Sequence, residues 1–210
     1  MKKSYSRINL LQAKLEGLSD SKGILGYLFT NRRYIEIEIP YYSYIRGKIF
    51  VEDLRDNYGD EVPISFDVGY LIYMLYTDFL SQIKKGLKNE DIAAYLLQGK
   101  EKHFKIAKKE RRVMRALTRH LLEVDTLEDE IEVSVPDNEK TACIELRMRE
   151  SKLLRAEVLI HDLQPYLKGS NLTVEQIIAI IYLDFISNIK NEGNSVKVQK
   201  SILAHIHSDN

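Results

Sequence analysis

The chain has 210 residues, of which 44% are hydrophobic, and its 31 lysines and arginines balance 31 aspartates and glutamates. This composition supports a folded core and excludes both a disordered chain and a polybasic protein whose whole surface attracts phosphate. The single cysteine, Cys143, cannot form an internal disulfide, which favours a reducing compartment. Because no apolar run has the roughly 20 residues of a membrane helix and no signal-peptide core follows the start, the sequence predicts a soluble, cytoplasmic protein without a membrane partner.

The first predicted element is a helix over residues 6–18. A strand follows at residues 35–40, where isoleucine alternates with glutamate and one face of a sheet would be apolar. We expect the sequence YYSY at 41–44 to form a turn and residues 49–54 to return as the next strand.

An amphipathic helix is predicted over residues 68–84, because its apolar side chains recur on one face. Asp67 is placed to cap its start, and Gly86 lies just beyond its end. A shorter helix is expected over residues 90–98.

The second part of the chain begins with a predicted helix over residues 102–122. Residues 131–135 and 144–148 alternate in hydropathy, and the sequence PDNEK at 136–140 suggests that they form a hairpin. Periodicity leaves residues 153–163 undecided between strand and helix.

The last predicted elements are a helix over residues 174–190 and a short helix over 196–207. Thr173 and Gln176 form a capping-box pattern at the start of the longer helix, and Gly193 follows its end.

The helices at 68–84 and 174–190 resemble each other closely, since eight of their seventeen aligned positions are identical. The strand blocks IEIEIP at 35–40 and IEVSVP at 131–136 are a second match in the same order. These matches predict an internal duplication.

We therefore expect a helix-rich α+β protein of two related α-β-β-α-α halves, residues 1–98 and 99–210, each with a small antiparallel sheet. The halves would pack about a pseudo-two-fold axis, with Arg32 and Arg33 facing Glu128 and Asp129 across the junction.

Several kinds of chemistry have no signature in this sequence. The glycine-rich phosphate loops, the HExxH zinc motif and paired cysteine motifs are missing, and the five histidines are scattered, so we expect no cofactor and no metal. The duplication does place Asp78 and Asp184 at the same position of an apolar helix. Two such carboxylates meeting in a cleft would support acid–base catalysis, but structural hydrogen bonding is the favoured interpretation, because no nucleophile or base motif accompanies them.

A basic surface is the first candidate for binding. The basic segment over residues 100–120, which covers most of the helix predicted at 102–122, has nine lysines and arginines against two glutamates, and as a helix it could lie along nucleic-acid phosphates. The other interpretation is a solvated helix whose charge is balanced by the acidic residues that follow it. The candidate contacts are Lys105, Lys108, Lys109, Arg111, Arg112 and Arg115. A helix-turn-helix is less well supported, since the helix over residues 90–98 begins with two acids.

An aromatic surface is the second candidate. Tyrosines crowd the expected turn after Pro40, and basic residues flank them; this combination is typical of protein-binding hot spots, although it could also stack unpaired bases. The residues are Tyr41, Tyr42, Tyr44, Arg32, Arg33, Arg46 and Lys48.

The sequence thus favours a non-enzymatic regulatory protein that binds a protein partner through this aromatic surface. The alternative is a DNA- or RNA-binding regulator that uses the basic segment. An enzyme built on Asp78 and Asp184 is the third hypothesis.

Overall fold

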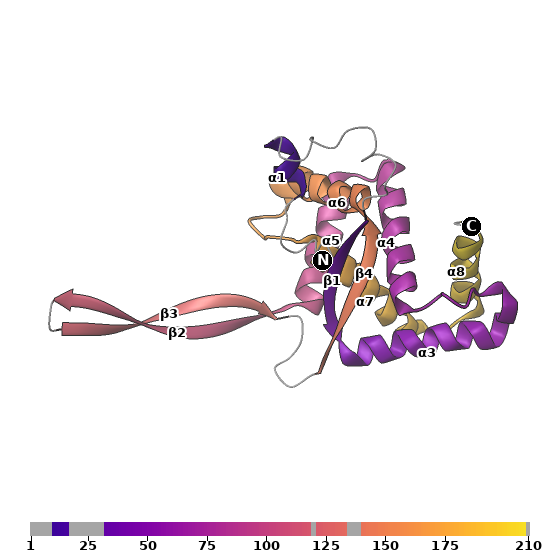
Figure 1. Ribbon diagram of the computed structural model, residues 1–210, viewed down its shortest axis with the longest axis horizontal. Coiled ribbons are helices and arrows are strands. Elements are labelled where there is room, and N and C mark those ends of the chain that lie inside the picture. Colours follow the sequence, from indigo (N-terminus) through magenta and orange to yellow (C-terminus); the bar gives the residue numbers. More distant parts are fainter. Residues whose placement is uncertain (1–9, 17–31, 119–120, 134–139, 209–210) are drawn as a thin grey trace.

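The computed structural model describes residues 10–16, 32–118, 121–133 and 140–208 of the chain (Figure 1). Helices dominate, and a small antiparallel sheet lies among them, so the predicted helix-rich α+β class is confirmed. None of the helices in these ranges is long and apolar enough to cross a lipid bilayer. In chain order the elements are α1 (Leu10–Leu15), β1 (Arg32–Pro40), α3 (Tyr41–Tyr58), the 3-10 helix η1 (Gly59–Glu61), α4 (Val68–Lys84), α5 (Asn89–His103), β2 (Lys105–Thr118), β3 (Leu121–Val133), β4 (Thr141–Arg149), α6 (Glu150–Leu163), the 3-10 helix η2 (Gln164–Tyr166), α7 (Val174–Glu192) and α8 (Val196–Ser208).

The central sheet consists of β1 and β4, which pair antiparallel with Glu36 opposite Glu145. Alternation in β1 buries Ile35, Ile37 and Ile39 completely, as its sequence pattern predicts. The expected hairpin between residues 131–135 and 144–148 is wrong, because β4 pairs with β1 from the distant start of the chain.

Helix α3 occupies the segment where a turn and a returning strand were expected. Its buried residues are Gly47, Phe50, Val51 and Leu54, and this spacing places them on one helical face. The turn predicted at 41–44 and the strand predicted at 49–54 are therefore wrong.

The predicted basic helix over residues 100–120 is also wrong. Helix α5 ends at His103, and the chain then forms the hairpin of β2 and β3, which projects as a long arm from the helical body (Figure 1). The hairpin also removes the predicted pairing of the two halves: Asp129 lies in register with Lys109, while Arg33 forms an ion pair of 3.0 Å with Glu150 at the start of α6.

Helix α4 begins and ends as its sequence predicts, and α7 begins as predicted but continues past residue 190 to Glu192. The Asp67 side chain accepts a hydrogen bond from the backbone N–H of Tyr70, and Thr173 and Gln176 complete a capping box. The undecided segment 153–163 is part of α6, and helices are present at both predicted short positions, as α5 and α8.

Two buried tyrosines connect pairs of helices through hydrogen bonds to backbone oxygens. The hydroxyl of Tyr76 in α4 donates to the backbone oxygen of Lys152 in α6 at 2.8 Å. The hydroxyl of Tyr182 in α7 donates to the backbone oxygen of Ser43 in α3 at 2.9 Å. Both rings are fully buried, and burial raises the pKa of both hydroxyls, so they remain protonated donors.

Candidate binding groove

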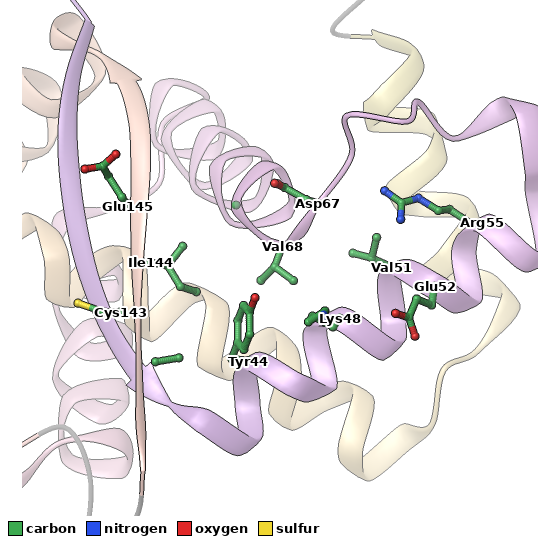
Figure 2. Close-up of a pocket in the computed structure, with 12 residues that line it drawn as sticks. Tyr44, Lys48, Val51, Glu52, Arg55, Asp67, Val68, Cys143, Ile144 and Glu145 are labelled. Atoms are coloured by element: carbon green, nitrogen blue, oxygen red, sulfur yellow. The ribbon is translucent and has the colours of Figure 1, made fainter. Parts of the chain in front are cut away.

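A groove lies where β4, α3 and the start of α4 meet. Its volume is about 450 Å³, in the range of ligand-binding clefts. Figure 2 shows Tyr44, Val68 and Ile144 around the space between the three elements. Its lining is Tyr44, Lys48, Val51, Glu52 and Arg55 of α3, Asp67, Val68 and Gly69 at the start of α4, and Ala142, Cys143, Ile144 and Glu145 of β4.

The pairing of the sheet explains why this space is open. Within the described residues β4 pairs with β1 alone, so one edge of β4 has no neighbouring strand. An unpaired strand edge leaves backbone donors and acceptors available to a further segment of chain. The groove therefore combines a polar strand edge with apolar side chains from two helices.

A second hollow of about 370 Å³ continues the groove along β4. Asp67, Gly69 and Glu145 line both spaces, so the two form one continuous surface. Gly69 lies close to both walls, since a Cβ atom there would be 3.3 Å from Oδ1 of Asp67 and in ordinary contact with Leu146 of the strand. The second hollow is more basic and aromatic, with Arg32, Arg147, Arg149, Tyr70 and Tyr73 among its lining residues.

The charged residues of the groove differ in how tightly the structure holds them. Arg55 donates to the backbone oxygen of Phe66 at 2.7 Å, and Asp67 caps α4, so both have structural roles. Lys48 is exposed and makes no hydrogen bond or ion pair with other described residues. Its ammonium group is therefore available to pair with a negative or carbonyl group of a bound partner.

The structure divides the predicted aromatic surface into three parts. Tyr44 and Lys48 line the groove, and Arg32 lines its continuation. Tyr41 and Tyr42, 39% and 58% exposed, lie at the first turn of α3. The centroid of the Tyr41 ring lies 4.9 Å from the ammonium nitrogen of Lys140, a cation–π arrangement.

The remaining two predicted residues are used inside the fold. Arg33 is bound to Glu150 in a largely buried ion pair. Arg46 donates to the backbone oxygen of Ile189 in α7 at 3.4 Å, and its Nε is buried without a partner among the described residues. We therefore expect these two arginines to orient elements and not to contact a partner.

The basic segment lies on β2, opposite an acidic strand. The register places Lys108 opposite Glu130 and Arg115 opposite Glu123. Counting residues 105–133, seven lysines and arginines are matched by seven aspartates and glutamates. The candidate residues Lys105, Lys108, Lys109, Arg111, Arg112 and Arg115 all belong to this strand. A protein–DNA or protein–RNA contact here remains a prediction, but its helical premise is wrong and its charge is balanced locally.

Asp78 and Asp184 have separate partners. Asp78 accepts a hydrogen bond from Gln82 at 2.8 Å and lies 3.4 Å from a ring nitrogen of His205. A small apolar hollow of about 190 Å³ is lined by Asp78 and His205, but not by Asp184.

Asp184 is bound by two neighbouring side chains at the end of α5. Lys102 and His103 lie 2.8 and 2.9 Å from its Oδ1. Burial would raise the pKa of Asp184, but the hydrogen bonds and charges of these two residues outweigh burial and lower it. Burial, and after it the charge and hydrogen bond of the same carboxylate, raise the pKa of the Tyr95 hydroxyl. These contacts fit the structural interpretation of Asp184 that the sequence favours.

Cys143 lies on β4, as a strand residue of small size, and its thiol donates to a carboxylate oxygen of Glu36 on β1. This hydrogen bond, then burial and nearby glutamates, raise the pKa of Cys143 to about 11. The thiolate is scarce at neutral pH, and the groove therefore has a poor nucleophile in this cysteine.

The groove itself was not predicted from the sequence, although Tyr44 and Lys48 were singled out. Its strand wall depends on β4 pairing with a distant strand, and local sequence patterns contain no signal for that pairing. Val51 and Val68 line the groove, but in the sequence they could not be distinguished from ordinary apolar core residues.

Within the described ranges, no group of three or more histidine, cysteine, aspartate or glutamate side chains is arranged to hold a metal ion. Comparison of the chain with protein-family models, with curated proteins and with solved structures found no match.

Proposed function

We propose that this protein is a non-enzymatic binding and regulatory protein whose partner is another protein, and that a segment of this partner occupies the groove between α3, the start of α4 and β4. The observation that carries the proposal is the open groove along the unpaired edge of β4. Its continuation past Gly69 provides the length that a peptide segment needs.

The lining of the groove fits a peptide better than a small polar metabolite. Val51, Val68 and Ile144 offer apolar contact, and Lys48 stands among them with its ammonium group unpaired by described residues. Tyr42, exposed on the neighbouring first turn of α3, adds the kind of aromatic area that dominates binding energy at interfaces. The nucleic-acid alternative has less support, since the register balances the charge of its candidate strand.

We further propose that the chain arose by internal duplication, with its halves related by a pseudo-two-fold axis. The corresponding sets are β1, α3, α4 and α5 against β4, α6, α7 and α8, which replaces the strand match between 35–40 and 131–136. Two hydrogen bonds support this assignment: Tyr76 binds the third residue of α6, and its aligned counterpart Tyr182 binds the third residue of α3. The division into halves at residue 99 stays a prediction.

Small residues at one matching position support the same correspondence. Gly47 and Ala156 are each the seventh residue of their helix. A Cβ atom at Gly47 would lie 2.1 Å from the hydroxyl of Tyr182, so this position must be small for the tyrosine to reach its acceptor. Ala156 is fully buried in α6, one turn beyond the acceptor of the other tyrosine.

A selection experiment tests the proposed function. A display library of random peptides is selected on the full chain, and the enriched peptides are measured on Lys48→Glu, Ile144→Asp and a control, Lys85→Glu. Lys85 is exposed just beyond α4, at the end opposite the groove. We expect the two groove changes to weaken binding while the control leaves it unchanged.

The exposed position of Lys48 keeps the test valid if Ile144→Asp unfolds the chain. Loss of binding in Lys48→Glu with a wild-type melting curve supports the proposal. Peptides that bind both groove variants as tightly as the wild type, or a library that yields no binders, would overturn it.

A further inference from the structure

We infer that the segment bound in the groove is a short amphipathic helix whose negative, C-terminal end faces Lys48. This inference rests on the proposed function and names the class of partner. Its basis is a helix of the same chain that is already docked on α6, the helix that corresponds to α3 in the other half.

That docked helix is α1, which lies against α6 (Figure 1). The backbone N–H of Leu10 donates to Oε1 of Glu157 at 3.0 Å, and the N–H of Leu11 donates to the other carboxylate oxygen. The side chain of Leu10 is 3% exposed and belongs to the hydrophobic core. A single carboxylate on α6 and a buried leucine thus hold the start of this helix.

Glu157 and Lys48 occupy the same position in their helices, since each is the eighth residue, of α6 and α3 respectively. The strands β1 and β4 also differ at matching positions, in the exposure of an isoleucine side chain. Ile35, the fourth residue of β1, is completely buried, whereas Ile144, the fourth residue of β4, is partly exposed and lines the groove. The half that binds α1 is therefore closed at this position, and the half with Lys48 is open.

The change of charge sets the direction of the expected helix. A helix start carries partial positive charge and unpaired N–H groups, which suit the carboxylate of Glu157. A helix end carries partial negative charge and unpaired carbonyl groups, which suit the ammonium group of Lys48. The apolar lining at Val51, Val68 and Ile144 would take the leucine-sized side chains of the same helix.

Charge reversal at Lys48 gives a direct test. The probe is a synthetic peptide with the sequence of residues 8–18, acetylated and amidated at its ends, which contains α1. In Lys48→Glu the open groove gains the carboxylate that holds α1 in the other half. We expect this variant of the full chain to bind the peptide roughly tenfold more tightly than the wild type, with Lys85→Glu as the control that shows no gain.

A second change locates the bound peptide. Adding Ile144→Asp to Lys48→Glu should abolish the gain if the peptide occupies the groove. Equal binding of the peptide by wild type and Lys48→Glu, or a gain that survives Ile144→Asp, would overturn the inference.

The selected peptides separate failure of this inference from failure of the proposed function. On the wild-type chain we expect enriched sequences with apolar residues three and four apart, typical of a helix. Groove-dependent peptides that instead alternate apolar and polar residues would show a strand added to β4, so the proposed function would stand and the helix would be refuted. The absence of groove-dependent peptides would refute the proposed function itself.

Discussion

The close approach of Gly47 and Tyr182 predicts that Gly47→Ala destabilises the wild type, although alanine is normally favoured over glycine in a helix. Gly47 lies inside α3, where alanine is intrinsically favoured over glycine by about 1 kcal/mol. A Cβ atom there would lie only 2.1 Å from the Tyr182 hydroxyl, which is fully buried and bound to Ser43. Gly47→Ala must therefore displace the ring or α3 and lose the hydrogen bond.

The structure allows the size of this effect to be worked out. Overpacking a buried position costs about 1–3 kcal/mol, and a lost buried hydrogen bond costs about 1–2 kcal/mol. Their sum exceeds the gain of about 1 kcal/mol in helix propensity. Tyr182→Phe alone should cost about 1 kcal/mol for the lost hydrogen bond, since the carbonyl of Ser43 lies inside α3 and keeps its helical partner. In that variant the nearest ring atom to the new Cβ is 3.2 Å away, so the clash is largely relieved. Gly47→Ala should then be neutral or stabilising.

Urea denaturation followed by circular dichroism measures the four free energies of unfolding in this double-mutant cycle. We expect Gly47→Ala to destabilise the wild type but not Tyr182→Phe. Tyr76→Phe is the control, because its hydroxyl binds Lys152 and should not couple to Gly47. Additive effects within about 0.5 kcal/mol would refute the close approach of α3 and α7.

Three further predictions concern other parts of the fold. Gly99→Ala places a Cβ atom 2.3 Å from Cγ2 of Ile180 and should lower the free energy of unfolding by about 1–3 kcal/mol, and Ile180→Leu, which removes that methyl group, should restore part of it. The pKa of Asp184 is lowered in the folded protein, so its stabilising effect is present above its ordinary pKa and is lost as the pH falls through the lowered value. Asp184→Asn should therefore show less acid destabilisation in urea titrations at successive pH values; an unchanged pH profile would contradict the assignment. The Cys143 thiol, whose pKa of about 11 depends first on its hydrogen bond to Glu36, should react slowly with iodoacetamide at mildly alkaline pH, and Glu36→Gln should speed the reaction; equal rates would argue against that bond.

The elements that the sequence predicted well are those that local signals determine. Asp67 and Thr173 cap α4 and α7, and each helix has a continuous apolar face, so neighbouring residues contain the whole signal. The alternation of isoleucine and glutamate in β1 is equally local.

The wrong predictions involve contacts between distant residues. Residues 105–118 contain apolar positions that suit a helix, but pairing with the acidic strand β3 makes them a strand. A turn was predicted at residues 41–44, whereas these residues begin α3, in which Gly47 has no side chain and admits Tyr182 from α7. The groove depends on the same kind of information, because β4 forms one wall only through its register with β1.

Nuclear magnetic resonance of the full chain, titrated with the tightest peptide selected from the display library, tests the central claim most directly. The claim is that a partner segment binds between α3, the start of α4 and β4. It predicts that the largest amide shifts occur at Tyr44, Lys48, Val68 and Ile144, around the groove of Figure 2. Shifts centred on the β2–β3 arm, or on α8, with these four residues unchanged, would contradict it.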